Sequence, residues 1–295
     1  LKKGDHILSC NSIFGSTHTV ISKYLPKYGI DFSYVSASAS AAEWEAAILP
    51  NTKMIYLESP TNPGLEVIDI AMVSSIAKKH NIILNVDNCF ATPIGQTPID
   101  LGADLVVHSA TKWIDGQGRV LGGAVVGRKD LIHEIYLFCR STGPSLSPFN
   151  AWILSKSLET LEVRMERHCS NALYLAEKLE GHSKINFVKY PFLTSHPHHA
   201  IAKKQMKNGG GIVCFEIKGG IDAGRRFLNE LKMLSLTANL GDSRSIASHP
   251  ASTTHAKLSE EERQAVGITP GLIRISVGLE HREDILADIL QALEA

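Results

Sequence analysis

Residues 105–113 have the sequence LVVHSATKW, an apolar run followed by two hydroxyl side chains and a lysine. The apolar run predicts a strand, and Ser109, Thr111 and Lys112 lie at its end. A lysine amine can bind an aldehyde cofactor covalently, and hydroxyls can donate hydrogen bonds to a phosphate. Taken alone, the motif also fits an ordinary surface lysine beside a turn.

Apolar runs of the same kind recur through the first half of the chain and alternate with helical patterns. Strands are predicted at residues 6–9, 32–35, 54–58, 82–86, 105–107 and 124–126, and helical patterns at 41–49 and 69–80. This alternation predicts a mostly parallel sheet with helices on both faces. Most of the runs are apolar throughout, which is typical of strands buried on both faces. The predicted fold class is therefore α/β.

The second half has a different pattern. A helical stretch at residues 150–179 leads to predicted strands at 185–188, 211–217 and 273–277 and to predicted helices at 223–231 and 282–292. Fewer crossovers between strand and helix predict a smaller α+β domain. A chain of 295 residues is long enough for two domains, which we expect at residues 1–157 and 158–295.

Composition excludes several functional classes. Lys plus Arg and Asp plus Glu both number 30, so there is no charge signature for nucleic acid or an anionic membrane. No apolar run approaches membrane-spanning length. The five scattered cysteines lack CxxC spacing, which argues against a disulfide framework or a zinc site and fits the cytoplasm. Residues 196–199, HPHH, lack carboxylate or cysteine partners, so a solvated turn is favoured over a metal site.

Polar residues follow three consecutive predicted strands: Asn62, then Asp87, then Ser109, Thr111 and Lys112. Ligands of open α/β sheets bind beyond the carboxyl ends of the strands. This set matches the needs of pyridoxal 5'-phosphate (PLP), in which a carboxylate keeps the ring nitrogen protonated, an amide binds the phenolate oxygen and hydroxyls bind the phosphate. The alternatives are a helix cap for Asp87 and turn chemistry for Asn62.

Four stretches also carry a family resemblance: SPTNP at 59–63, VDN at 86–88, HSATK at 108–112 and LIRISVGLE at 272–280. They resemble the cysteine/methionine-metabolism family of PLP-dependent enzymes, the cystathionine γ-synthase-like branch of the aspartate-aminotransferase (type I) fold. The likeness extends from Gly4 to the C-terminal helix. It implies a mostly parallel large domain and a smaller α+β C-terminal domain.

Within this family, DGQGRVLGG at 115–123 and STGPSLSPFNAW at 141–152 are most similar to the O-succinylhomoserine sulfhydrylases. The resemblance implies a transferase of trans-sulfuration in methionine biosynthesis, which converts O-succinyl-L-homoserine and sulfide to L-homocysteine and succinate. Cystathionine γ-synthase, O-acetylhomoserine sulfhydrylase and γ-lyase activities share the cofactor residues and stay open as alternatives. The resemblance also implies a homotetramer, a dimer of dimers.

For the cofactor, the resemblance assigns each residue a role. Lys112 would be the Schiff-base lysine and, once released, the base that moves protons between substrate carbons. Asp87 would pair with the pyridine nitrogen, and Ser109 and Thr111 would hold the phosphate. Asn62 would contact the cofactor oxygen.

For the substrate, the resemblance gives Arg274 the α-carboxylate, which the planar donor fork of a guanidinium suits. Asn62 would touch the same carboxylate, as would Asn239, which stands where many relatives have serine. Arg119 is a candidate for the succinyl carboxylate. The alternatives are an interdomain salt bridge for Arg274 and a structural loop arginine for Arg119.

Phe14 stands where most of the family has a tyrosine stacked on the cofactor ring. Its ring can stack or simply pack, but it has no hydroxyl. In relatives that cleave C–S bonds, that phenol is thought to serve the leaving group. A thiol has a pKa of about 8.5 and a carboxylic acid one near 4, so a carboxylate needs a proton donor far less. Phe14 therefore favours an acylated homoserine as substrate, and Ser16 replaces a cysteine typical of methionine γ-lyases.

Family members carry a segment before the equivalent of Gly4, with a Ser-Gly-Met loop that binds phosphate at a helix start and a Tyr-x-Arg that reaches the neighbouring subunit. Neither motif is present in these residues, so we expect either a partial sequence or a large domain that lacks its N-terminal part. The second case admits a different class, an inactive homologue with a structural or binding role. A nucleotide-binding domain is disfavoured because no glycine-rich loop follows a strand.

Overall fold

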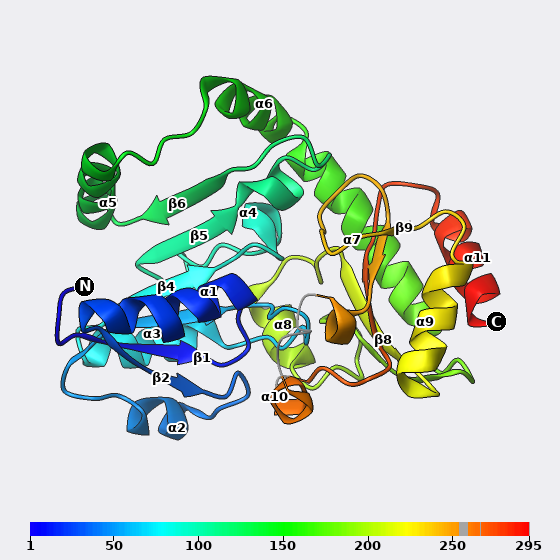
Figure 1. The fold of residues 1–295 in the computed structure, drawn as a ribbon, viewed down its shortest axis with the longest axis horizontal. Coiled ribbons are helices and arrows are strands. Elements are labelled where there is room, and N and C mark those ends of the chain that lie inside the picture. Colours follow the sequence, from blue (N-terminus) through cyan, green and yellow to red (C-terminus); the bar gives the residue numbers. More distant parts are fainter. Residues whose placement is uncertain (254–258, 266, 295) are drawn as a thin grey trace.

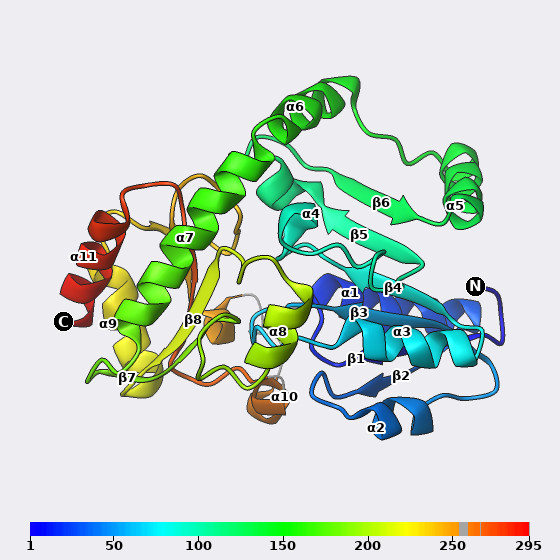
Figure 2. The same cartoon turned by 180° about the vertical axis from the view of Figure 1, so that it is seen from behind.

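The chain forms two β-sheets side by side, joined by the long helix α7 (Leu161–Leu179) (Figure 1). The computed structural model describes residues 1–253, 259–265 and 267–294. Figure 2 shows from behind how α7 runs diagonally from the first sheet to the second.

The first sheet has six strands in the order β2-β1-β3-β4-β5-β6, and all neighbours are parallel except β5 and β6. Each predicted strand is found within two residues at either end, so the mostly parallel sheet is confirmed. The strands are β1 (His6–Cys10), β2 (Asp31–Val35), β3 (Thr52–Glu58), β4 (Ile83–Asp87), β5 (Leu105–Ser109) and β6 (Gly123–Gly127).

The central strands of this sheet alternate between an apolar and a polar face. Ile55 and Leu57 of β3 are fully buried in the core beneath helices α2 and α3, whereas Tyr56 and Glu58 point to the opposite face. The same alternation continues in β4, where Asp87 lies opposite Glu58. β3 and β4 therefore depart from the expectation that most of these runs are apolar throughout, and their polar face is where the candidate site lies.

Local sequence explains the helices that cover this sheet. Ser40 and Glu43 form a capping box at the start of α2, and the Asp69 side chain accepts a hydrogen bond from Met72 N at the start of α3. Helix α1 lies over the polar face, since His18 stacks on Tyr34 with ring centroids 5.1 Å apart. The helical segments of this half are α1 (Gly15–Thr19), a π-helical turn (Val20–Tyr24), a 3-10 turn (Leu25–Tyr28), α2 (Ala41–Ala46), α3 (Ile70–Lys79), α4 (Thr92–Gly95) and a π-helical turn (Ala110–Ile114).

The second sheet is mostly antiparallel, in the order β7-β8-β11-β10-β9, and helices α7, α9 and α11 enclose an apolar core with it. The predicted α+β layer is therefore confirmed. Its elements are β7 (Ile185–Lys189), α8 (His199–Gln205), β8 (Ile212–Ile217), α9 (Gly220–Glu230), β9 (Ser235–Leu236), β10 (Ile246–Ser248), a 3-10 turn (Pro250–Ser252), α10 (Glu260–Ala265), β11 (Leu272–Ser276) and α11 (Arg282–Leu293).

The single helical stretch predicted at residues 150–179 is two helices, α6 (Pro148–Leu158) and α7. The Arg164 guanidinium donates to Ser157 O at 2.9 Å and to Trp113 O at 2.7 Å. Arg164 thus satisfies a carbonyl at the end of α6 that would otherwise need a helical partner. The same side chain fixes the segment that carries Lys112.

One part of the first half is largely exposed. Helix α5 (Lys129–Thr142) has no buried residue, and the apolar side chains of Val126, Phe138 and Trp152 are exposed on β6, α5 and α6. No helix was predicted at α5.

The domain boundary predicted between residues 157 and 158 falls at the end of α6 and stays a prediction.

Candidate active site

Lys112 lies where the two sheets meet. It follows β5 in a π-helical turn that breaks at this residue, and its Nζ donates to Oδ1 of Asn239 from the second half. Gly241, at φ 77°, brings its backbone against that of Lys112, and a Cβ there would come within 2.7 Å of Trp113 N. Glycine is thus required for this close approach.

The Lys112 amine is partly removed from water. Burial lowers its pKa from the usual value, and the nearby Arg274 charge lowers it further, while Cys89 acts in the opposite direction. A lowered pKa increases the fraction of neutral amine, which is the form that attacks a carbonyl or accepts a proton.

Asp87 ends β4 on the polar face. Its Oδ1 accepts from Cys89 N at 3.0 Å and its Oδ2 accepts from the Tyr56 hydroxyl at 3.2 Å. Burial raises the pKa of Asp87 to about 6. No ion pair with a described residue accompanies these bonds, so Asp87 is a partly buried carboxyl that lacks a cationic partner.

Glu58 and Tyr56 belong to the same cluster, and the sequence analysis missed both. Glu58 is 4% exposed, pairs in register with Asp87, and accepts a hydrogen bond from Phe14 N at 2.8 Å. Their spacing of two residues on β3 was the available signal, because it places both side chains on one face of a strand.

Arg274 reaches the site from β11 and is 1% exposed. Its Nη1 donates to Asn62 Oδ1 at 2.9 Å, and its Nη2 donates to Ala238 O at 3.1 Å and Asn239 O at 3.3 Å. Its Nε is buried and has no hydrogen-bond partner. The salt bridge predicted as the alternative is not formed with any described residue, and the orphaned Nε suits a bound carboxylate.

The residues predicted to contact the phosphate and the cofactor ring differ in whether their side chains already have partners within the chain. The Thr111 hydroxyl is engaged locally, since it accepts from Gly122 N at 3.1 Å and donates to Gly122 O at 3.3 Å. The Ser109 hydroxyl makes no side-chain hydrogen bond with a described residue. Phe14 is 46% exposed, so its side chain is accessible for stacking.

Arg119 is engaged in its own loop. Its Nε donates to Asp115 Oδ1 at 3.0 Å, and its Nη2 donates to Asp115 O at 3.1 Å and to Ser157 Oγ at 2.6 Å. These contacts favour the structural alternative over a role in binding the succinyl group.

The segment 196–199 is a turn before α8, but it is not solvated. His196 is buried, and its Nε2 lies 3.1 Å from Leu65 O. The prediction of a solvated turn is therefore wrong for His196. Among the residues that the structure describes, no group of three or more His, Cys, Asp and Glu side chains is arranged to hold a metal ion.

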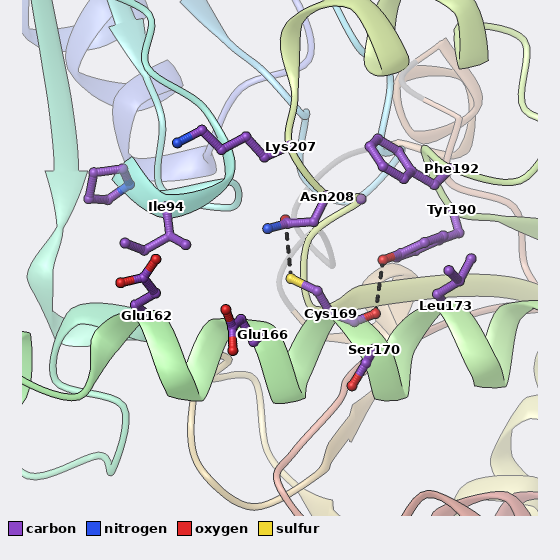
Figure 3. Close-up of a pocket in the computed structure, with 12 residues that line it drawn as sticks. Ile94, Glu162, Glu166, Cys169, Ser170, Leu173, Tyr190, Phe192, Lys207 and Asn208 are labelled. Atoms are coloured by element: carbon purple, nitrogen blue, oxygen red, sulfur yellow. Dashed lines mark hydrogen bonds between the residues drawn. The ribbon is translucent and has the colours of Figure 1, made fainter.

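A pocket of about 480 Å³ lies elsewhere, between α4, α7 and the loop before β8 (Figure 3). Its floor is held by the Cys169 thiol, 3.1 Å from Asn208 Oδ1, and by the Tyr190 hydroxyl, 3.3 Å from Cys169 O. None of the predicted site residues lines it, so it is separate from the candidate site.

The model of the family described as Cys/Met metabolism PLP-dependent enzyme matches residues 1–294. The chain belongs to this family. It is 49% identical to the O-succinylhomoserine sulfhydrylase of Pseudomonas aeruginosa, over 99% of the chain and 72% of that protein. It is 46% identical to the L-methionine gamma-lyase of Fusobacterium nucleatum subsp. polymorphum, over 100% of the chain and 75% of that protein. The similarity thus includes relatives that carry out different reactions.

A solved structure gives the same result for the fold. Cystathionine gamma-lyase from Lactobacillus plantarum, complexed with L-serine, superposes with a TM-score of 0.96 at 36% identity, covering 100% of this chain and 77% of that one. The type I PLP fold is therefore confirmed, as are the family resemblance and PLP as the cofactor. Among the described helices, none is long and apolar enough to cross a membrane.

The site fits PLP on three independent observations. Asp87 is a partly buried carboxyl without a cationic partner among the described residues, as a protonated pyridine nitrogen requires. Lys112 presents a partly buried amine with a lowered pKa. Arg274 has an orphaned buried Nε that a carboxylate of the substrate would satisfy.

Proposed function

We propose that this protein replaces the succinyloxy group of O-succinyl-L-homoserine with sulfide, forming L-homocysteine and succinate. The Cγ–O bond breaks, a Cγ–S bond forms, and no net oxidation occurs. When bound, PLP supplies an electron sink that stabilises negative charge next to the substrate nitrogen. The residues named below supply binding, orientation and proton transfer.

Lys112 is proposed as the residue that binds the cofactor and moves the protons. Burial lowers the pKa of its amine, which favours the neutral form that can accept a proton from a substrate carbon and return it to another. Asn239 orients the amine through its Oδ1. Asp87 would hold the pyridine nitrogen, and Ser109 and Thr111 the phosphate.

Arg274 is proposed to bind the α-carboxylate of the substrate. Its guanidinium is already held by Asn62 and by the carbonyls of Ala238 and Asn239, so little ordering is needed when the carboxylate arrives. The Asn62 Oδ1 is used by Arg274, which leaves its Nδ2 to donate to the cofactor oxygen or to the same carboxylate.

Phe14 is the observation that carries the choice of reaction. Its backbone is fixed beside the strand ends by Glu58, and its exposed ring has no phenol to protonate a leaving group. A leaving carboxylate needs no such donor at neutral pH, whereas a thiolate does. The 49% identity with the Pseudomonas aeruginosa sulfhydrylase supports the same choice.

Product identification tests this proposal. We expect the purified protein with O-succinylhomoserine and sulfide to form homocysteine and succinate in equal amounts. O-acetylhomoserine tests the acyl group, and cysteine in place of sulfide tests for cystathionine formation. Release of methanethiol from methionine, at a rate comparable to homocysteine formation, would instead establish a γ-lyase, which the 46% identity with a methionine γ-lyase makes the main rival.

A matched variant tests the role of Phe14 directly. Phe14→Tyr restores the phenol and keeps the ring, so we expect it to raise turnover of methionine while changing turnover of O-succinylhomoserine less than about three-fold. An unchanged ratio of the two activities would remove Phe14 as the basis for the assignment.

An inactive homologue with a binding role is the alternative from another class. A visible absorbance band from bound PLP that disappears in Lys112→Ala, together with turnover of any of these substrates, argues against it.

A homotetramer is proposed for the assembly, because Val126, Phe138 and Trp152 leave apolar surface exposed on one side of the chain. Light scattering at several protein concentrations measures this.

A further inference from the structure

Glu58 has a position that the proposed reaction does not explain. It is 4% exposed, and it makes no ion pair with a described residue. An isolated buried carboxyl is costly, so such a group is retained where it has a specific partner. Its partner here is the backbone N–H of Phe14, 2.8 Å from Oε2.

The bond joins two segments that are distant in sequence. Phe14 lies in the turn between β1 and α1, which presents the exposed aromatic ring, and Glu58 is the last residue of β3. Asp87, at the end of β4, is the register partner of Glu58. The Glu58 carboxyl therefore fixes the backbone of Phe14 relative to Asp87, the group proposed for the pyridine nitrogen.

The two carboxyls cannot both carry a charge at low cost, because they lie on neighbouring strands and face the same side. Each carboxyl has two donors, the Tyr56 hydroxyl and Cys89 N for Asp87 and the backbone N–H groups of Phe14 and Asn62 for Glu58. Glu58 is 4% exposed whereas Asp87 is only partly buried, so ionisation costs more at Glu58. The pair therefore places its negative charge on Asp87. Burial and the Asp87 charge both raise the pKa of Glu58 well above its usual value, which agrees.

We propose that Glu58 is a positioning residue, which as a neutral carboxylic acid holds the Phe14 backbone against the strand ends and leaves the negative charge of the pair on Asp87. This inference rests on the proposed contact of Asp87 with the cofactor, but not on which substrate is used. The charged and titratable groups that act on Glu58 or respond to it come from several elements: Cys10, Tyr56, Asp87, Cys89 and Arg274.

Two substitutions distinguish the effect of the charge of the Glu58 side chain from the effect of its length. Glu58→Gln keeps the length and an acceptor oxygen and resembles the protonated acid, whereas Glu58→Asp keeps the acid but is one methylene shorter. The control is Thr52→Ser, which removes one buried carbon from the other end of β3 and keeps the hydroxyl that bonds to His6.

Amide hydrogen exchange of the segment around Phe14 is the first measurement, made on the holoenzyme. We expect Glu58→Gln and Thr52→Ser to exchange as the wild type does and Glu58→Asp to exchange about ten-fold faster, since one hydrogen bond is lost. This measurement does not depend on the substrate assignment. Wild-type exchange in Glu58→Asp would overturn the proposal.

Retention of PLP on dilution, followed by its visible absorbance from pH 6 to 9, is the second measurement. Glu58→Gln should bind PLP within about three-fold of the wild type with the same pH midpoint, and Glu58→Asp about ten-fold more weakly. A shifted midpoint or a ten-fold loss in Glu58→Gln would mean that Glu58 is ionised, and this overturns the proposal even if Glu58→Asp fails to fold. A residue with only a structural role would lower thermal stability in Glu58→Asp without changing local exchange or cofactor retention.

Discussion

The two sheets contribute to the candidate site in different ways. In the first sheet, Asn62, Asp87 and Lys112 follow the ends of neighbouring strands, where a parallel arrangement gathers them at one edge. In the second sheet, Arg274 lies in the middle of β11, an antiparallel strand with otherwise apolar neighbours. Its side chain reaches the site through the hydrogen bond from Nη1 to Asn62 Oδ1, and no rule of topology places it there.

This difference predicts a division of labour, in which the first sheet holds the cofactor and the second holds the substrate carboxylate. Variants in the first sheet should alter the visible absorbance and the retention of PLP. A variant of Arg274 should alter the concentration of substrate needed and leave the absorbance unchanged.

Lys112→Ala should have the largest effect. Loss of proton transfer alone lowers kcat by about 10²- to 10⁴-fold, and loss of covalent attachment removes the absorbance of the bound cofactor. Steady-state rates and a visible spectrum measure both. Lys156→Ala, at an exposed lysine of α6, serves as the control and should match the wild type.

Asp87→Asn tests the contact that the first sheet is proposed to make with the ring nitrogen of the cofactor. The variant loses the charge proposed to face the ring nitrogen, so PLP should be retained about 10- to 100-fold less well. Equilibrium dialysis followed by absorbance gives the ratio. Unchanged retention would show that the first sheet does not hold the ring nitrogen through Asp87.

Arg274→Lys should have a smaller and different effect. The ammonium keeps the charge but loses the planar fork, so kcat/KM should fall about ten-fold, mainly through KM. The PLP spectrum should stay as in the wild type, and Arg282→Lys is the exposed control. Loss of the spectrum in Arg274→Lys would break the division between the two sheets.

The stability of the protein with PLP removed should depend on pH through Asp87. Its pKa is about 6 in the folded chain and about 3.9 when unfolded, so its ionisation is less favourable in the folded state. The stability it contributes is complete below about pH 4 and is lost as the pH rises through 6. Thermal unfolding between pH 4 and 7 should show this fall in the wild type and a flatter profile in Asp87→Asn.

Arg119→Ala should have the smallest effect on function. Because Asp115 and Ser157 already bind the guanidinium, the preference for succinyl over acetyl esters should change by less than about three-fold. The loss of these bonds should cost about 1 kcal/mol of stability. A large loss of preference for the succinyl ester would restore Arg119 as a substrate residue.

The sequence predicted the six strands of the first sheet because long apolar runs and the turns between them are local features. It also predicted the residues that follow those strands, since parallel topology brings strand ends together. It missed Glu58 and Tyr56, because their contribution depends on which face of β3 is apolar, and that is decided by α2 and α3. It missed the separation of α6 from α7, which depends on a distant contact from Arg164.

The hydrogen bond from Lys112 to Asn239 also has a mechanical consequence. At the site, it and the bond from Arg274 to Asn62 are the side-chain bonds described here that cross from one sheet to the other. An amine that is attached to the cofactor can no longer donate to Asn239 in the same way. If Lys112 binds the cofactor as proposed, loading would release this bond, while others, such as that from Gln205 Nε2 to Gln96 Oε1 at 3.0 Å, would still join the two halves. The lysine proposed to carry the chemistry is thus also one of the contacts between the two halves of the chain.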